Sequence, residues 1–244
     1  MKRRLFVGDL HGCADELADL LQNFGFVSGS DSNPSLSDLN PDANSRGDAL
    51  YSVGDVVGKG PKPRETLEIL AQCRARVVLG NHDAFCLAAA ATPEPLQSDS
   101  QRFYLASLGS EEERERWLTE IASWPLFIEL PDILLVHAGL EPGVSHPSRM
   151  RRKILFSIRT WDGKGEDLKS ESNPPWFECV STDKTVVFGH WAKRGLIDLP
   201  RFKGLDTGCV YGKKLTGWCP EEDRFYQVPA RKTYAAIPEK DSAD

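Results

Sequence analysis

The chain has 244 residues, of which 40% are hydrophobic, and it carries a formal net charge of −6. A chain of this size can bury a substantial core, and about 250 residues are still compatible with one α/β domain. Lys and Arg gather only in short runs such as Arg151-Arg152-Lys153, so the sequence gives no indication of a nucleic-acid-binding surface. An anionic ligand would have to be held by local groups.

The N-terminal run over residues 1–7 is charged and then apolar, but Gly8-Asp9 ends its apolar part after three residues. This pattern predicts a first strand and not a secretory signal. No stretch approaches the ~20 apolar residues of a membrane span. The six cysteines are scattered without a CxxC pair, which favours reduced thiols over a disulfide framework. We therefore expect a soluble, cytoplasmic protein without membrane partners.

Short apolar, β-branched runs, each followed by Gly and a polar residue, predict buried strands. In chain order they cover residues 5–7, 49–53, 77–79, 133–136 and 185–188. Apolar residues at helical spacing predict helices over residues 14–24 and 63–73. The later segment 214–228, with Pro220-Glu221-Glu222-Asp223 at its centre, predicts a hairpin.

Alternating strands and helices followed by a hairpin predict an α/β fold with a mixed sheet. We expect one domain over residues 1–230 and a polar tail over residues 231–244. Residues 31–48 are rich in Ser, Asn, Asp and Pro and predict a flexible surface insertion within that domain.

The ends of the predicted strands carry residue types that bind metals. Four of the five histidines of the chain lie there. The strand-end residues are Asp9 and His11, Asp55, Asn81-His82-Asp83, His137 and His190. Carboxylate, imidazole and amide donors suit Mn, Fe, Zn or Co. One such histidine would more often be structural, as we expect for His146, but the joint pattern predicts a metal centre.

Asp9-x-His11, Gly54-Asp55, Gly80-Asn81-His82-Asp83 and two later histidines, in this order, resemble the motifs of the calcineurin-like metallophosphoesterases. The resemblance implies a mixed β-sheet sandwich flanked by helices. It also implies two divalent metal ions as cofactors. Mn²⁺ is the expected metal, and Mg²⁺, Co²⁺, Fe and Zn²⁺ are the alternatives. Two cations about 3.5–4 Å apart activate a bridging hydroxide for in-line attack on phosphorus.

The resemblance assigns a role to each strand-end residue. By it, Asp9 and His11 hold the first metal, Asn81, His137 and His190 hold the second, and Asp55 bridges the two. His82 would lie beside the metals and protonate the departing oxygen, and Asp83 would fix its tautomer and raise its basicity. This pair is the His-Asp dyad of the phosphoprotein-phosphatase branch. From its position alone, Asp83 could also cap a helix that starts near residue 84, and the two roles can coexist.

Flanking motifs resemble the symmetrical diadenosine tetraphosphatases within that branch. They are Gly54-Asp55 with Gly60-Pro61, Pro175-Trp176-Phe177, residues 188–192 and residues 205–212. Asp83 favours this group, because the protein Ser/Thr phosphatases usually carry Glu there. The resemblance implies hydrolysis of diadenosine tetraphosphate or related dinucleoside polyphosphates, symmetrically to nucleoside diphosphates.

Three residues are candidates for binding the substrate. Lys59 occupies a position where the family usually has a phosphate-binding Arg, and it supplies a point charge in place of a bidentate fork. Arg159 corresponds to a second phosphate-binding arginine, and Tyr211 to an aromatic hydroxyl near the metals. The structural alternatives are a solvated loop lysine, an exposed arginine paired with a carboxylate, and core packing of the tyrosine.

Only about twenty residues separate His137 from Arg159, where the tetraphosphatases that the chain resembles have a longer helical insertion, so the resemblance implies a reduced cap over the site. Bulkier substrates, such as phosphoproteins or nucleotide-capped RNA, therefore remain alternatives to a small nucleotide substrate. The alternative functions are a Ser/Thr or Tyr phosphoprotein phosphatase that uses the same site and, more remotely, a non-catalytic scaffold. The complete ligand set speaks against the scaffold.

Overall fold

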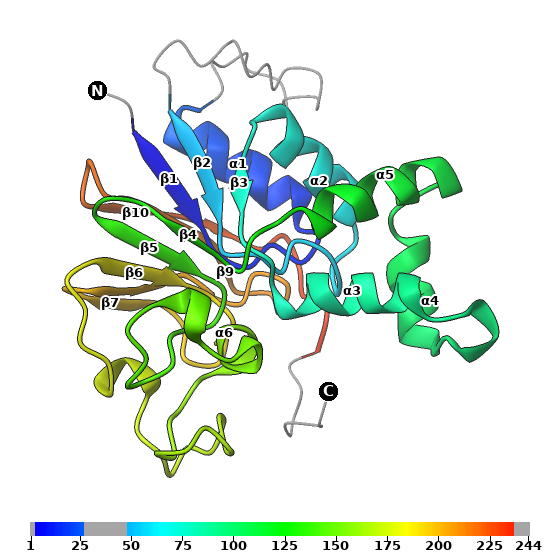
Figure 1. Ribbon diagram of the computed structural model, residues 1–244. Helices are drawn as coiled ribbons and strands as arrows, with labels where there is room; N and C mark the ends of the chain where they lie inside the picture. Colours follow the sequence, from blue (N-terminus) through cyan, green and yellow to red (C-terminus); the bar gives the residue numbers. More distant parts are fainter. Residues whose placement is uncertain (1–2, 27–47, 237–244) are drawn as a thin grey trace.

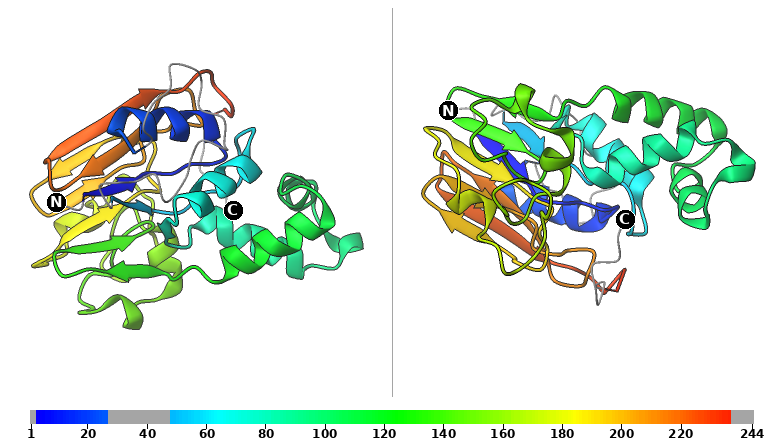
Figure 2. Two further views of the ribbon diagram at one scale, coloured as in Figure 1. Left: turned by 90° about the horizontal axis from the view of Figure 1, so that it is seen from above. Right: turned by 60° about the horizontal axis from the view of Figure 1, so that its bottom comes forward.

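The computed structural model describes residues 3–26 and 48–236. Apart from Asp48, the predicted insertion over residues 31–48 lies outside the described residues, as does the chain beyond residue 236. Two five-stranded sheets pack face to face, and helices lie on their outer sides (Figures 1 and 2). This arrangement confirms the predicted α/β sandwich in a single domain.

The first sheet has the strand order β10-β9-β1-β2-β3. Its strands are β1 (Arg4–Val7), β2 (Ala49–Ser52), β3 (Arg76–Val77), β9 (Lys214–Cys219) and β10 (Arg224–Pro229). β1, β2 and β3 run parallel, and β9 pairs antiparallel with both β1 and β10. The predicted hairpin is therefore present, and it extends the parallel part of the sheet.

The second sheet has the strand order β4-β5-β6-β8-β7. Its strands are β4 (Phe127–Glu129), β5 (Ile133–Val136), β6 (Thr185–Phe188), β7 (Ile197–Leu199) and β8 (Phe202–Gly204). The central strands β5, β6 and β8 run parallel, and the edge strands β4 and β7 run antiparallel to their neighbours. Each sheet thus has three parallel strands whose carboxyl ends can meet at one edge.

The described helices lie in three places around the two sheets. They are α1 (Ala14–Phe24), α2 (Pro63–Gln72), α3 (Asn81–Ala91), α4 (Asp99–Ala106), α5 (Glu111–Ala122) and α6 (Arg152–Ser157), with short 3₁₀ turns at Glu94–Leu96, Pro147–Arg149 and Trp176–Glu178. α1 packs on β9 and β10, while α3, α4 and α5 form a lobe at the side of the sheets (Figure 1). α6 lies beside the second sheet, in the segment predicted to be a reduced cap. None of the described helices is long and apolar enough to cross a membrane.

Alternation along the strands divides the core into three parts. In β1, Leu5 and Val7 face the helices, whereas Phe6 points between the sheets and stacks on Tyr51 at a ring distance of 4.7 Å. Successive side chains of a strand point to opposite faces, so a continuous apolar run serves two cores. Beyond the second sheet, the fully buried Trp176 anchors a third cluster. Both faces of each sheet are thus covered.

The first residues of the predicted tail pack on the domain. The backbone N–H of Arg231 and the hydroxyl of Tyr234 both donate to Oε1 of the buried Glu16 in α1, at 2.9 and 2.7 Å. Thr233 forms a β-bridge with Tyr211. The boundary at residue 230 stays a prediction, but residues 231–236 belong to the packed structure. All six cysteines lie in the described residues as free thiols.

Candidate metal centre

The strand-end residues of both sheets converge at one edge of the sandwich. Asp9 and His11 follow β1, Asp55 follows β2, and Asn81 begins α3 shortly after β3. From the second sheet, His137 follows β5 and His190 follows β6. The carboxyl ends of parallel strands are the usual place for a ligand in α/β folds.

Asp55 lies between two groups of candidate ligands. Its Oδ2 is 3.6 Å from Nε2 of His11, and its Oδ1 is 3.5 Å from Nε2 of His137. The ligand atoms of Asp55, His11 and His82 lie within 4.8 Å of one another, and so do those of Asp55, His137 and His190. One carboxylate with a histidine on each oxygen has the arrangement needed to bridge two cations.

The second group is completed by Asn81. Its Oδ1 lies 2.9 Å from Nε2 of His137 and 3.0 Å from Nδ1 of His190. An amide oxygen between two imidazole nitrogens is a hard donor beside two borderline ones, a set that suits divalent first-row metals.

Asp9 is held against the loop that carries His190, whose backbone N–H lies 3.1 Å from both carboxylate oxygens. Gly189 permits this approach, because a Cβ there would overlap Oδ1 of Asp9. Asp206, at the end of β8, also interacts with Asp9, and both carboxylates are buried. Asp206 belongs to residues 205–212, one of the flanking motifs named above. Nothing in that motif indicated that Asp206 lies in the site.

Carbonyl groups orient two of the ligand rings. Nδ1 of His137 lies 2.8 Å from the carbonyl oxygen of Val53, and Nδ1 of His11 lies 3.4 Å from that of Val57. A proton on Nδ1 leaves the lone pair on Nε2, the atom that faces Asp55 in both rings. Such outer contacts fix the tautomer of a metal-binding histidine.

Three candidate ligands adopt left-handed backbone conformations. His11, Asp55 and His190 have φ angles of 44°, 49° and 66°. Such angles cost about 1–3 kcal/mol for residues other than glycine and cluster at functional sites. The other described non-glycine residues with positive φ are Arg74 and Asp223, outside the centre. Because the strain is concentrated on these candidate ligands, we infer that the positions of their side chains matter more than the stability of the local backbone.

The carboxyl groups of the centre are buried close together and therefore resist ionisation. Burial raises the pKa of Asp9 well above its usual value, and the charges of Asp206 and Asp55 raise it further. Burial also raises the pKa of Asp55 to about 7. Cations held between these groups would compensate their charge, so the donor set fits metal ions.

The histidines of the centre are neutral, as metal ligands must be. Burial is the main cause that lowers the pKa of His11, His137 and His190, and the charge of a neighbouring His or Lys lowers that of His11 further. The pKa of His82 is lowered to about 3, first by burial and then by the charge of Lys59. All four imidazoles can therefore offer a lone pair at neutral pH.

Asp83 has partners other than the expected His82. Its Oδ1 accepts from the backbone N–H groups of Val56 and Val57, at 2.9 and 3.1 Å, and its Oδ2 accepts from that of Gly80 at 3.0 Å. Asp83 therefore ties the first turn of α3 to the loop after β2. The sequence left open that Asp83 caps a helix starting near residue 84, but α3 starts at Asn81 and its N-cap is Gly80, so Asp83 supports the helix end from within the first turn. Nδ1 of His82 meets the hydroxyl of Tyr104 in α4 instead, at 2.5 Å.

The structure brings the three predicted substrate-binding residues to the same region. Nζ of the half-buried Lys59 donates to the hydroxyl of Tyr211 at 2.7 Å, and its charge lowers the pKa of Asp9 and Asp55. Arg159 lies close enough to His190 for its charge to lower the pKa of that ring. The positive charges therefore border the metal ligands, where an anionic substrate would need them.

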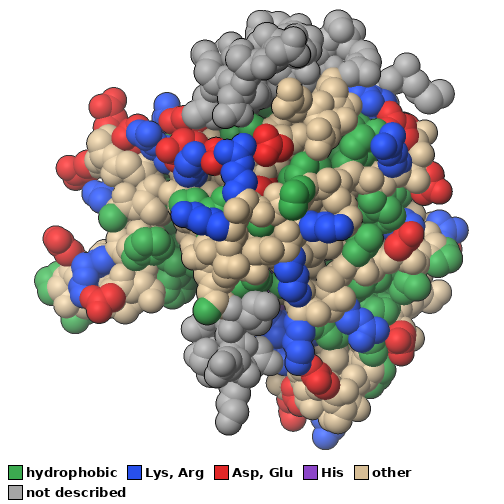
Figure 3. All heavy atoms as spheres, turned by 180° about the vertical axis from the view of Figure 1, so that it is seen from behind, with side chains coloured by type: hydrophobic (Ala, Val, Ile, Leu, Met, Phe, Trp, Pro, Cys, Tyr) green, Lys and Arg blue, Asp and Glu red, His purple; other side chains and the backbone are tan. Residues whose placement is uncertain are grey.

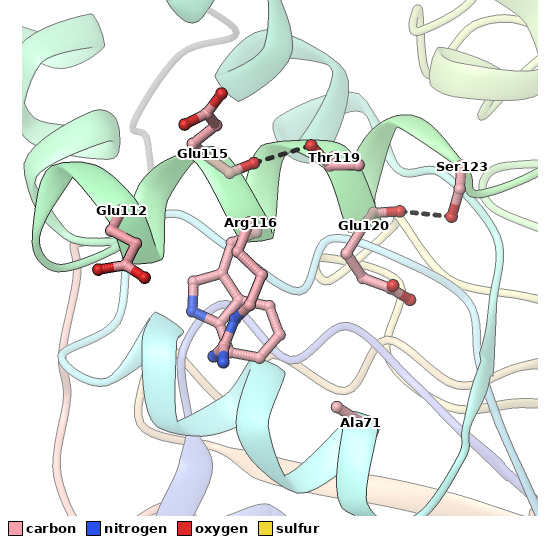
Figure 4. A pocket seen from close by; sticks show the side chains of 8 residues that line it. Ala71, Glu112, Glu115, Arg116, Thr119, Glu120 and Ser123 are labelled. Carbon is pink, nitrogen blue, oxygen red and sulfur yellow. Dashed lines mark hydrogen bonds between the residues drawn. The ribbon is translucent and has the colours of Figure 1, made fainter.

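Other surface features lie apart from this centre. A groove between α2 and α5 is lined by Trp117, several glutamates and Ala71, and it contains none of the candidate ligands (Figure 4). On the face drawn in Figure 3, acidic and basic side chains are interspersed and no histidine is visible.

Comparison with known proteins identifies the family. The model of the calcineurin-like phosphoesterase family matches residues 2–220, so the chain belongs to this family, whose members use a dinuclear metal centre. The sequence-based assignment to this family is thereby confirmed.

Two curated relatives share a name. The symmetrical bis(5'-nucleosyl)-tetraphosphatase of Aeromonas salmonicida is 31% identical over 92% of this chain and 96% of its own. That of a Janthinobacterium species is 32% identical over 86% and 90%. A crystal structure provisionally described as a diadenosine tetraphosphatase aligns over 94% of each chain with a TM-score of 0.75 and 31% identity. A protein Ser/Thr phosphatase from Saccharomyces cerevisiae, at 14% identity and a TM-score of 0.57, is similar in fold alone.

The pKa of Asp55 leads to a prediction on metal binding. Because this pKa is about 7 in the absence of a cation, a metal must displace a proton below pH 7 but not well above it. We expect the affinity for Mn²⁺ to fall by up to about tenfold per pH unit below 7 for each proton displaced. Calorimetric titration of chelator-treated protein between pH 6 and 8 measures this. Asp198 is an exposed carboxylate, so the control variant Asp198→Asn should show the same dependence of Mn²⁺ affinity on pH. Equal affinity at pH 6 and pH 8 in the parent protein would contradict the prediction.

Proposed function

We propose that this protein is a metal-dependent phosphoesterase that hydrolyses diadenosine tetraphosphate, or a related dinucleoside polyphosphate, symmetrically to nucleoside diphosphates. The observation that carries the reaction class is the position of Asp55 between the histidines of two sheets. The substrate class is supported by about 31% identity to symmetrical tetraphosphatases over nearly the whole chain.

We propose a division of the ligands between two cations. Asp9 and His11 serve the first, Asn81, His137 and His190 serve the second, and Asp55 serves both. The contacts of these residues support the division. Asn81 joins two imidazole nitrogens that would share one ion. Asp55 contacts one imidazole of each group, as a residue that serves both ions would. Two divalent ions, Mn²⁺ or one of Mg²⁺, Co²⁺, Fe and Zn²⁺, would lower the pKa of a water molecule and neutralise phosphoryl oxygens.

His82 serves the departing oxygen in this proposal. It lies near His11 and Asp55, so it could also bind a metal. We assign it to the leaving group because the other ligands already give three donors to one ion and four to the other. Its lowered pKa means a neutral ring, which donates through a single nitrogen. A polyphosphate anion beside the ring would raise that pKa and so favour the protonated ring, the form that has a proton to give to the departing oxygen.

Lys59, Arg159 and Tyr211 would hold the phosphate chain. The net charge of −6 gives a tetraphosphate no general attraction, so positive charges next to the ligands must supply it. Lys59 presents a point charge, already aimed by its hydrogen bond to Tyr211. Arg159 offers the planar fork that matches two phosphate oxygens at once.

Product analysis tests the proposed reaction. Protein loaded with Mn²⁺ is incubated with diadenosine tetraphosphate in ¹⁸O-labelled water, and products are separated by chromatography and weighed by mass spectrometry. We expect ADP alone, with the label on one terminal phosphate of each product pair, because water attacks an inner phosphorus. Appearance of ATP with AMP would refute symmetrical cleavage. Faster turnover of a phosphopeptide or a nucleotide-capped RNA, assayed in parallel, would assign the site to that substrate class instead.

The variant His82→Asn separates the two possible roles of His82. If His82 serves the leaving group, the variant should lose about 10²- to 10⁴-fold in kcat while it keeps two metal ions per chain. Metal content is measured by elemental analysis after gel filtration. A variant with fewer than two ions would show that His82 is a ligand.

Lys59 has a matched control three residues further along the chain. Removing the charge in Lys59→Ala should raise KM for diadenosine tetraphosphate by about 10- to 100-fold, since hydrogen bonds to charged groups contribute about 1.5–3 kcal/mol. Lys62 pairs with Asp15 in α1, which is not one of the candidate ligands. Lys62→Ala should therefore stay near the parent value. Equal KM values for both variants would remove Lys59 from the substrate site.

A further inference from the structure

Tyr104 contacts the ring nitrogen of His82 that does not serve the substrate. Its hydroxyl oxygen lies 2.5 Å from Nδ1 of His82, and the two rings are nearly parallel, at an angle of 13°. Tyr104 belongs to α4 and is 8% exposed, whereas His82 stands in the first turn of α3. The contact therefore joins α4 to the start of α3, where the candidate ligand Asn81 lies.

The loop after β2 leaves room for this hydroxyl. Gly58 has a φ of +124°, and a Cβ there would lie 2.7 Å from the hydroxyl oxygen of Tyr104. Any larger side chain at residue 58 would displace Tyr104 from His82. On the other side, Phe85, one turn beyond His82 in α3, packs edge-on against Tyr104 at a ring distance of 5.2 Å. The phenol is thus confined on two sides.

The usual partner of a catalytic histidine is a carboxylate, but Asp83 is committed elsewhere. Both of its oxygens accept from the backbone N–H groups of residues 56, 57 and 80. A further carboxylate against His82 would also add negative charge beside Asp9, Asp55 and Asp206, which are already buried together. A phenol can orient the ring without adding that charge.

We propose that Tyr104 is a positioning residue for His82. Its hydroxyl donates to Nδ1 and so holds the tautomer that carries the proton on Nε2, the nitrogen left to donate to the departing oxygen. The inference rests on the proposed function for the role of His82, but the tautomer itself does not depend on any activity. A neutral orienting group suits a leaving group such as a nucleoside diphosphate, whose oxygen needs a hydrogen bond more than a strong acid.

The tautomer is read directly by NMR. Full-length ¹⁵N-labelled protein is loaded with diamagnetic Mg²⁺, and long-range ¹H–¹⁵N spectra report which ring nitrogen of each histidine is protonated. The His82 signals are assigned by their absence in His82→Asn. We expect Nε2–H in the parent and a mixture of tautomers in Tyr104→Phe. A parent with the proton on Nδ1 overturns the proposal, whether or not the variant folds.

A double-mutant cycle gives the kinetic counterpart. Tyr104→Phe should lower kcat for diadenosine tetraphosphate about tenfold with KM and metal content unchanged, and should cost nothing further in the His82→Asn background. Phe103→Leu, an exposed neighbour in α4, is the control and should match the parent. An equal loss in both backgrounds would mean that Tyr104 acts only on the fold and would refute the proposal.

The two failures are distinguishable. A parent that leaves diadenosine tetraphosphate intact contradicts the proposed function, yet its spectra still decide the tautomer. A parent that hydrolyses it, with Tyr104→Phe unchanged in both kcat and tautomer, contradicts the role of Tyr104 alone.

Discussion

The position of the Asp55 carboxylate is the constraint on which the rest of the site depends. One oxygen faces His11 and the other faces His137, so ligands carried by different sheets meet on a single group. The backbone N–H of His82 fixes that group at 2.9 Å, and Asp83 in return holds the residues that follow Asp55. Because these bonds run in both directions between a loop and a helix start, neither segment can shift without the other. The two-sheet sandwich serves to bring these strand ends together.

The electrostatics of the centre explain why one neighbouring residue, Lys59, is charged and another, Tyr104, is neutral. Carboxylates buried close together resist ionisation and need cations, which the neutral histidines can help to bind. Lys59 places a positive charge at the border of this group, and that charge holds down the pKa of the carboxylates. Tyr104 meets His82 with a neutral hydroxyl, which orients a ring without disturbing the balance between cations and carboxylates. Lys59 thus provides a positive charge for a substrate anion, whereas Tyr104, which only orients His82, is neutral.

The main strands, and the meeting of the six candidate ligands at one edge of the sandwich, could be predicted because they follow local rules. Apolar runs that serve two cores are conspicuous in a sequence, and histidines that follow them are rare enough to be informative. The edge strand β7 and the strand β8 have only three residues each, too few for a periodic signal. The partners of Asp83 depend on backbone groups 26 and 27 residues away, and Tyr104 reaches His82 through the packing of two helices. Asp206 likewise becomes part of the site only because β8 pairs beside β6.

The segment after β10 extends the influence of the centre to a remote part of the chain. Thr233 forms a β-bridge with Tyr211, whose hydroxyl accepts a hydrogen bond from Nζ of Lys59. Tyr234 anchors the same segment to α1 by a hydrogen bond to Glu16. A truncation after residue 230, the domain boundary predicted from the sequence, would remove this support from behind Lys59. For the protein engineer, fusion partners and purification tags at this end therefore call for a spacer that begins beyond residue 236.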